Sequence, residues 1–218
     1  MRRVFFGLAA ATAFAQPAQA AEAGDVLVRL RGIMVSPTET SGSVLPGFPG
    51  EKVKVDDSIM PEVDVTWMAT RTIGFELIAA TTKHDASGKT GTIGSIGKLA
   101  STWVLPPTLT AQYHFAPDAK VRPYVGAGLN YTIFYSEDAS TGLESAVGKT
   151  RVRMSDSFGW AAQAGVDIDL NEKVFLNIDV KYIDIDTKAR LDTTAAGTQR
   201  VKVSLDPIVF GLGIGTRF

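Results

Sequence analysis

The sequence is informative first through what it lacks. Its 218 residues contain no cysteine, which excludes disulfide scaffolds, thiolate metal sites, cysteine nucleophiles and Cys-anchored lipoproteins. The 22 lysines and arginines nearly balance the 23 aspartates and glutamates. The basic excess of nucleic-acid-binding domains is therefore missing, and we expect no nucleic-acid partner. Beyond the first twenty residues, no segment approaches the ~18 consecutive apolar residues of a membrane-spanning helix. Yet 45% of the residues are hydrophobic, so their distribution along the chain must be the main clue.

The first twenty residues have the composition of an export signal. The chain starts with Met-Arg-Arg, continues through an apolar stretch from Val4 to Ala15, and reaches Ala18-Gln19-Ala20. A basic start, a short apolar run and an A-x-A end are typical of a secretory signal peptide. We therefore predict that residues 1–20 are a cleaved signal peptide and that residues 21–218 form a single barrel domain.

Apolar and polar residues alternate with period two through eight segments of the mature chain. These segments are 26–34, 62–67, 74–79, 108–115, 124–133, 158–168, 176–182 and 208–218. Short connections (70–72, 116–120 and 171–173) alternate with long ones (36–58, 83–102, 136–153 and 188–198). Period two is typical of a half-buried strand. An even number of strands with short periplasmic turns and long extracellular loops is typical of outer-membrane barrels. We predict an all-β fold, an eight-stranded antiparallel transmembrane β-barrel of the bacterial outer membrane.

The aromatic residues distinguish a membrane barrel from a soluble one, which also alternates. Ten of them lie on the apolar face of their strands. One group falls near the short turns and the other some eight to twelve residues further along: Trp67, Phe75, Tyr113, Phe115 and Phe218, and then Tyr131, Phe158, Trp160, Tyr182 and Phe210. Two such girdles match the two membrane interfaces. The apolar face is therefore expected to face lipid.

The opposite face carries charges that we expect to point into the lumen. They are Arg29, Arg31, Lys181 and Arg217 against Glu62, Asp64, Glu76, Asp167 and Asp179. Eight strands enclose just enough space for side chains to fill, and an unpaired buried charge is costly. We therefore expect a salt-bridged plug across the lower barrel and no wide aqueous pore. A purely structural role for this plug remains open.

Several segments resemble the outer membrane protein W (OmpW) family. They are residues 73–81, 105–109, 122–131, 184–187 and 205–218, in family order and across nearly the whole mature chain. The resemblance implies an eight-stranded barrel associated with passage of small hydrophobic molecules. It also implies that barrel-assembly machinery recognises Phe218. Relatives usually carry Trp at the position of Phe158, so the resemblance places a constriction there.

The upper inward positions are less charged than the lower ones, and we expect them to line an apolar extracellular funnel. The residues are Ile33, Val35, Phe134, Phe158, Ile183, Val203 and Leu205. A small hydrophobic solute would enter the funnel, meet the plug and leave sideways between strands into the bilayer. Pro61 and Pro207 lack a backbone donor and could loosen strand pairing at such an exit, although they also suit ordinary bends at the barrel rim.

Other functions remain open from the sequence. The resemblance also implies a structural or stress-response barrel whose extracellular loops act as a surface receptor. A lipid-modifying enzyme is disfavoured because neither His84 nor His114 stands in a His-x-Ser arrangement, and we expect no catalytic residues. We expect no cofactor and no metal, since Asp184 and Asp186 offer fewer oxygens than Ca²⁺ prefers. The expected partners are outer-membrane lipids, lipopolysaccharide and small hydrophobic solutes.

Overall fold

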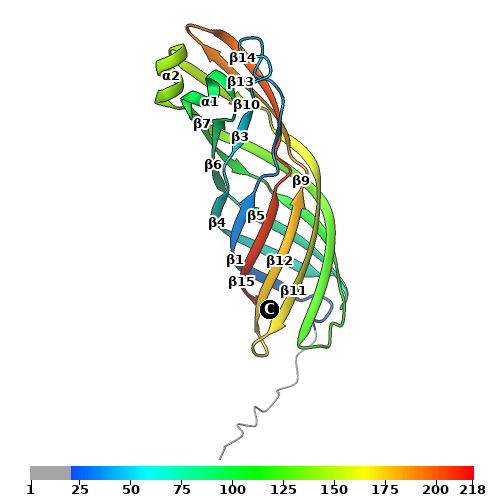
Figure 1. Cartoon of the computed structure of the whole chain (residues 1–218). Helices are drawn as coiled ribbons and strands as arrows, with labels where there is room; N and C mark the ends of the chain where they lie inside the picture. Colours follow the sequence, from blue (N-terminus) through cyan, green and yellow to red (C-terminus); the bar gives the residue numbers. More distant parts are fainter. Residues whose placement is uncertain (1–20) are drawn as a thin grey trace, which may run out of the picture.

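Eight antiparallel strands close into a barrel in the computed structural model, which describes residues 21–218 (Figure 1). The predicted signal peptide, residues 1–20, lies outside the described residues. The barrel strands are β1 (Val26–Ser36), β4 (Ser58–Met68), β5 (Ile73–Ala80), β8 (Thr108–His114), β9 (Val121–Ala139), β11 (Ser157–Asp169), β12 (Val174–Ile183) and β15 (Ile208–Arg217). Their order is β11-β12-β15-β1-β4-β5-β8-β9, and pairing of β9 with β11 closes the ring. The predicted fold class is confirmed.

The strand register decides which side chains face the lumen. Residues directly opposite each other in an antiparallel pair share a face, and Arg29 is opposite Asp64 on one side and Gly215 on the other. Arg31 is likewise opposite Gly213. A Cβ atom at Gly213 would collide with the backbone of Leu30 and Arg31. Small inward residues on β15 therefore make room for the two long arginine side chains of β1.

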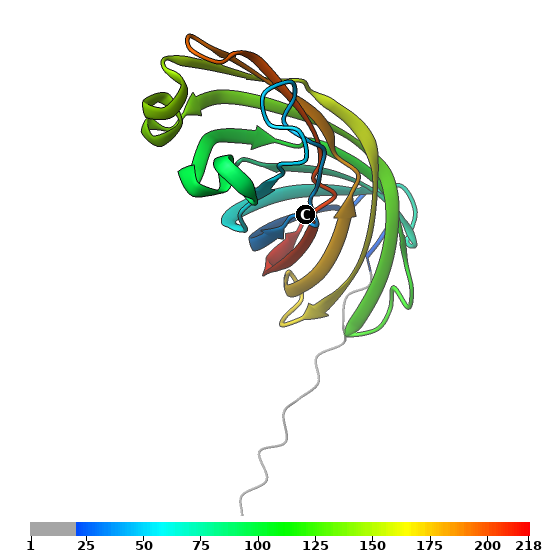
Figure 2. The same cartoon turned by 45° about the horizontal axis from the view of Figure 1, so that its top comes forward.

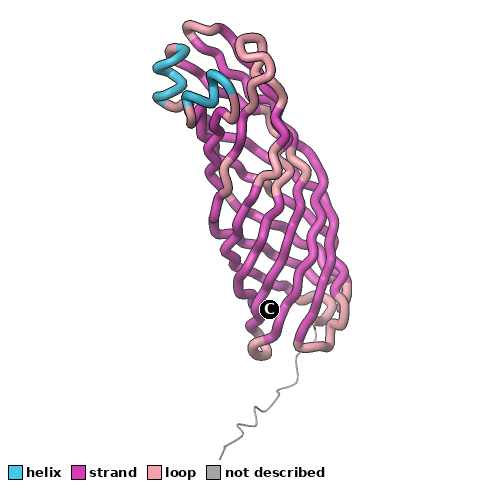
Figure 3. Tube along the Cα trace, in the orientation of Figure 1, coloured by secondary structure: helices cyan, strands magenta, loops and turns pink. Residues whose placement is uncertain are grey.

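Three tight connections lie at one end of the barrel, at residues 69–72, 115–120 and 170–173. The described ends of the chain meet at the same end, where Val26 and Phe218 exchange two backbone hydrogen bonds of 3.0 Å. The long connections lie at the other end (Figure 3). Since short turns are periplasmic in outer-membrane barrels, the long connections are extracellular, as predicted.

The long connections are largely folded, which the sequence analysis did not predict. They contain β2 (Thr40–Ser41), β3 (Val53–Val55), β6 (Thr82–Gly88), β7 (Lys98–Leu105), β10 (Thr150–Met154), β13 (Asp186–Thr193) and β14 (Gly197–Ser204), together with the short helices α1 (Gly91–Ile96) and α2 (Thr141–Val147). Strands β7, β6 and β3 continue from β9, while β10-β13-β14-β2 form a separate sheet. Figure 2 shows α1 and α2 together at the extracellular end. Alternation continues in this region, but the many glycine, serine and threonine residues obscure it.

The outer surface of the barrel is apolar between two aromatic girdles. Exposed leucine and isoleucine side chains, such as those of Leu77, Leu129 and Ile214, cover the middle. Trp67 stacks on Phe75 with a centroid separation of 6.2 Å in the lower girdle, and Trp160 lies 5.1 Å from Tyr182 in the upper one. The predicted outward placement of the aromatic residues is confirmed. Within residues 21–218, no helix has the length and apolar character needed to cross a membrane.

Candidate functional site

Arg29 lies at the centre of the charged lower lumen. Its Nε and Nη2 atoms donate to the two carboxylate oxygens of Asp167 at 3.3 and 2.9 Å. Its Nη1 atom donates to Asp64 at 2.9 Å and to the Thr66 hydroxyl at 2.7 Å. Strands β1, β4 and β11 are thereby joined through one guanidinium group across the lumen.

Arg31 extends this network upward. Its Nη2 atom lies 2.7 Å from Glu62 and 2.8 Å from Asp64, and its Nη1 atom lies 2.9 Å from Asp179. Lys181 bridges the same two outer carboxylates, with Nζ 2.8 Å from Glu62 and 3.1 Å from Asp179. Each cation therefore contacts at least two carboxylates, which offsets the cost of removing these charges from water.

Glu76 belongs to the same network, and Arg217 to another. Glu76 accepts hydrogen bonds from Gln163 at 2.6 Å and Thr110 at 3.1 Å, and it lies 3.5 Å from Arg29. Arg217 lies lower, 3.8 Å from Asp169 and 3.9 Å from Asp25. The structure thus brings eight of the nine charged residues expected in the plug into one cluster. We use "plug" for these eight: Arg29, Arg31, Glu62, Asp64, Glu76, Asp167, Asp179 and Lys181.

The plug is buried and packed. Its charged side chains are 0–3% exposed in every ion pair they form with one another. Neutral neighbours complete it. Asn177 accepts from Arg31 at 3.1 Å and donates to Asp167 at 2.8 Å and to the Tyr124 hydroxyl at 3.1 Å. The lower lumen is therefore filled with side chains.

The lower lumen also contains residues that were not predicted from the sequence. Arg122 pairs with Asp169 below the plug. The guanidinium of Arg29 lies over the rings of Tyr124 and Phe175, at 5.4 and 5.5 Å from the ring centres. Arg122 and Tyr124 occupy inward positions of the β9 alternation, so the signal that identified the other charges would have found Arg122 as well.

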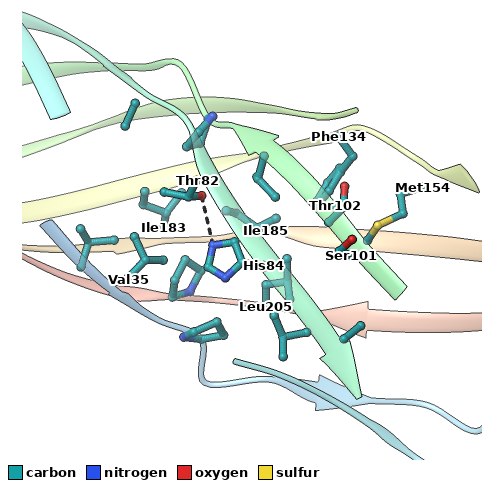
Figure 4. A pocket seen from close by; sticks show the side chains of 18 of the residues that line it. Val35, Thr82, His84, Ser101, Thr102, Phe134, Met154, Ile183, Ile185 and Leu205 are labelled. Atoms are coloured by element: carbon teal, nitrogen blue, oxygen red, sulfur yellow. Dashed lines mark hydrogen bonds between the residues drawn. The ribbon is translucent and has the colours of Figure 1, made fainter. Parts of the chain in front are cut away.

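Above the plug the lumen becomes apolar and contains a cavity of about 80 Å³. Glu62 lies at its lower end, and the predicted residues Ile33, Val35, Phe134, Ile183 and Leu205 line it, several of which appear in Figure 4. A second cavity of about 80 Å³ continues toward the extracellular end, and Val203 lines it. A water molecule needs only ~10–15 Å³ measured in this way, so each cavity has room for a small apolar group.

Phe158 is not part of this lining, so its predicted constriction is wrong. Its side chain is 70% exposed and lies on the outer face, opposite Tyr131 of the neighbouring strand. The physical reason is parity, since period two places residue 158 with the outward Trp160. The resemblance had placed it inside, and the alternation had already placed it in the upper girdle.

The predicted open funnel also differs from the structure. Apolar residues of the long connections are buried over the second cavity: Val44, Ile93, Leu143, Val147 and Val201. They belong to the same hydrophobic cluster as Ile33 and Leu205. The extracellular segments therefore fold over the apolar lumen because this contact removes their own apolar side chains from water.

His84 is a buried polar residue of the cavity wall that the sequence analysis assigned to a loop. Figure 4 shows its ring in the cavity, next to Thr82 on the same strand. Its Nδ1 atom donates to the Asp56 carbonyl at 3.0 Å, and its Nε2 atom lies 3.0 Å from the Thr82 hydroxyl. A carbonyl only accepts, so Nδ1 carries the proton and Nε2 accepts from Thr82. Burial lowers the pKa of His84 below its ordinary value, which favours this neutral ring.

Within the described residues 21–218, no group of three or more histidine, aspartate or glutamate side chains is arranged to hold a metal ion. Within those residues, Asp184 and Asp186 at the barrel rim are not joined by a third such side chain. The lumen offers apolar contact above, a few hydrogen-bonding groups on β6 and β7, and ion pairing below.

The fold has counterparts among known proteins. The model of the OmpW family matches residues 22–218. This chain belongs to the OmpW family. Outer membrane protein W of Escherichia coli is 39% identical over 212 residues, which cover 97% of this chain and 96% of the relative. Outer membrane protein W of Vibrio cholerae is 35% identical over the full length of both chains. The crystal structure of OprG from Pseudomonas aeruginosa superposes with a TM-score of 0.85 at 33% identity, covering 92% of this chain and 99% of that one. As an OmpW-family barrel with two aromatic girdles, the protein is integral to the bacterial outer membrane.

Proposed function

We propose that this barrel accepts small, predominantly apolar molecules into the cavity above the plug and releases them sideways into the outer membrane. The observation that carries the proposal is the vertical division of the lumen. Ile33, Phe134 and Leu205 surround an apolar cavity, and the buried ion pairs of the plug lie directly beneath it. An apolar solute gains free energy in the cavity and would lose it among unsolvated charges.

The polar residues of β6 and β7 on the cavity wall narrow the class of solute that the cavity can accept. Thr82, His84 and Thr102 place hydroxyl and imidazole groups on a wall that is otherwise apolar. Specific pockets combine apolar walls with a few polar groups that orient the ligand. The preferred solute is therefore mainly hydrocarbon with one hydrogen-bonding group, such as a small alcohol, ketone or ester.

An interruption in the barrel wall supports sideways release. Strands β5 and β8 pair up to Ile78 and Thr108, and β6 and β7 pair again from Thr82 and Val104. Pro106 lies between these two ladders and lines the cavity. A proline has no backbone donor for the missing ladder bonds, so the wall above the β5–β8 ladder is an interrupted barrier between cavity and lipid.

The two prolines proposed from the sequence differ in position. Pro207 lines the cavity but is buried, and its carbonyl accepts a hydrogen bond from Ile183 at 3.2 Å. Pro61 is exposed on the outer face and is paired opposite Gly32. Pro106, which was not proposed from the sequence, is half-buried and borders the cavity. We therefore propose that the solute leaves the barrel beside Pro106.

The test is uptake of a small apolar fluorescent probe by cells that produce the barrel. Ile33→Asp puts a carboxylate into the cavity wall and should reduce barrel-dependent uptake at least fivefold. Ile33→Leu keeps the side chain apolar and should leave uptake within twofold of wild type. Equal uptake by Ile33→Asp and wild type, at equal amounts of folded barrel, would contradict the proposal.

A surface-receptor function is the second candidate, because the long connections form ordered sheets and helices instead of mobile loops. Replacing the segment from Thr194 to Gly197, which lines neither cavity, by a different turn separates the two functions. A receptor would lose its ligand, whereas uptake of the apolar probe should persist.

We also propose that barrel-assembly machinery recognises Phe218, which is 75% exposed at the end of the closing strand pair. Phe218→Ala should lower the amount of heat-modifiable folded barrel in the membrane. Phe115→Ala, at a similarly low position on the outer face, is the matched control.

A further inference from the structure

The outer face of the extracellular sheet β10-β13-β14 is strongly basic. Six exposed cations lie on it, two from each strand: Arg151, Arg153, Lys188, Arg190, Arg200 and Lys202. The residues between them point to the other side, where Val152, Ala189 and Val201 line the upper cavity. Alternation thus collects the six cations on one side of the sheet. We call this set the basic face.

The strand register places like charges directly opposite each other on the basic face. Arg153 is opposite Arg190, and Arg190 is opposite Arg200, which makes a row of three arginines across three strands. Lys188 is opposite Lys202 in the next row. Like charges at opposed positions destabilise a sheet. The chain as a whole carries a net charge of −1, so this concentration does not follow from overall composition.

Few acidic groups of the chain compensate the basic face. Within the described residues, Arg190 is the member that forms an ion pair, with Asp192 at 2.9 Å. The other five have no carboxylate within ion-pair distance in that part of the chain, and Asp192 is also the acidic residue directly opposite Arg151. The arrangement is unfavourable for the isolated barrel and becomes favourable when an anion lies against the sheet, because the ligand then supplies the missing negative charge.

The basic face stands just above the membrane. Lys188 follows Tyr182 of the upper girdle by six residues, which at ~3.3 Å per residue and the strand tilt of a barrel corresponds to roughly 15 Å. Lys188 and Lys202 also border a surface hollow that contains the exposed ring of Phe158. Asp156 and Asp186 line the same hollow, and their carboxylates accept hydrogen bonds from the hydroxyl groups of Tyr131 and Ser204. Cations next to an apolar ring match an amphiphilic anion better than a soluble polyanion.

We propose that the basic face binds the phosphate groups of lipopolysaccharide in the surrounding outer leaflet. Arginine forks bind phosphate through two parallel hydrogen bonds, and the row of three arginines offers several such forks side by side. The lysine row lies nearer the membrane, where it binds the phosphate closest to the acyl chains. Phe158 packs beside those acyl chains. This site is separate from the cavity and does not depend on solute passage.

The test is binding of fluorescently labelled lipopolysaccharide to the folded barrel in zwitterionic detergent micelles. A five-residue variant of the basic face should raise the apparent Kd at least tenfold and flatten the salt dependence of binding. Its substitutions are Arg153→Gln, Lys188→Gln, Arg190→Gln, Arg200→Gln and Lys202→Gln. The control variant removes five exposed cations from the other extracellular segments: Lys52→Gln, Lys54→Gln, Lys83→Gln, Lys89→Gln and Lys98→Gln. It should stay within twofold of wild type. Heat-modifiable gel migration verifies that each variant is folded.

Two further probes distinguish the ligand chemistry. Dephosphorylated lipopolysaccharide should bind the wild-type barrel as weakly as intact lipopolysaccharide binds the five-residue variant. Heparin serves as the soluble polyanion and should bind more weakly than lipopolysaccharide. The proposal is overturned if the five-residue variant binds lipopolysaccharide like wild type or if removal of phosphate has no effect. It is also overturned if heparin is the tighter ligand and loses affinity in the variant, which would make the basic face a site for soluble polysaccharides.

Discussion

The lower and upper halves of the lumen are built by the same strands and differ in almost every physical property. Below, Arg29 and Arg31 bind five carboxylates among buried neighbours. Above, Ile33 and Val35 of the same strand line a cavity with an almost wholly apolar wall. Four residues of β1 therefore cross from a closed region to one that can hold a solute. Residue type at inward positions, and not the number of strands, therefore determines where this lumen is filled and where it is hollow.

The largest effect should come from removing the central cation of the plug. Arg29→Met leaves Asp167 without a cationic partner and Asp64 and Glu76 with Arg31 alone, and breaking a buried ion pair in this way costs ~3–5 kcal/mol. Urea unfolding of the barrel in lipid vesicles, followed by tryptophan fluorescence, measures the loss. Ile33→Val in the upper half is the matched control and should cost only ~0.5–1.5 kcal/mol. Equal losses for the two variants would show that the halves do not differ as described.

The next largest effect should come from locking the interrupted barrel wall beside the upper half of the lumen. Lys83 and Trp103 are paired residues above the interruption at Pro106, and Cα atoms at opposed positions are within disulfide reach. The double variant Lys83→Cys, Trp103→Cys should take up the apolar probe severalfold more slowly when its disulfide is formed. Uptake should return to its original rate when the disulfide is reduced. The chain has no other cysteine that could interfere.

A second disulfide serves as the control for this experiment. Val180→Cys with Phe210→Cys joins β12 to β15 at a continuous part of the wall and should leave uptake unchanged. If the variant with cysteines at positions 83 and 103 takes up the probe as fast when oxidised as when reduced, release through this wall is ruled out.

A smaller effect, dependent on pH, should arise at His84 in the upper half. Because burial lowers the pKa of His84, the ring stays neutral as pH falls to its ordinary value of about 6.5 and gains a proton only below that. Protonation puts a charge into the apolar wall, so affinity for an apolar probe should be full at neutral pH and fall in mild acid. The charged residues near the ring are Asp56, Asp57, Asp85 and, at the cavity floor, Glu62.

Fluorescence titration of a bound apolar probe between pH 7.5 and about 5 checks this prediction. His84→Gln keeps a hydrogen-bonding side chain without titrating, and its affinity should be constant over the range. If His84→Gln and wild type lose affinity in parallel, the titrating group lies elsewhere.

The smallest effect should come from an ion pair outside the lumen. Arg71 and Asp118 pair between two periplasmic turns, and both side chains are more than half exposed. Exposed pairs contribute ~0–1 kcal/mol, so Asp118→Asn should shift the urea midpoint little. A loss comparable to that of Arg29→Met would mean that burial does not set the strength of these contacts.

Period two was sufficient to predict the barrel and most of the plug. Each inward charge from Arg29 to Lys181 lies on a strand whose other face is apolar, and alternation alone determines the side to which a residue points. Arg122 could have been found by the same rule. Phe158 shows the limit of transferring a role from relatives, because the strand parity placed it correctly while the resemblance did not.

The extracellular cover could not be predicted in this way. Ile93 and Leu143 are buried because α1 and α2 pack over a lumen formed by distant strands, and no local pattern encodes that contact. His84 looked like a loop residue since its burial depends on Asp56, which is 28 positions away. The basic face likewise emerges only when the register of β10, β13 and β14 aligns its arginines.

The central claim is that the plug closes the lumen while the cavity above it serves apolar solutes. The most direct test measures both properties on one preparation of purified barrel, as ion current across a planar bilayer and as transfer of a small apolar probe into liposomes. The account predicts negligible steady ion current together with barrel-dependent transfer of the probe, and loss of that transfer in Ile33→Asp. A steady ion conductance without transfer of the probe would contradict it.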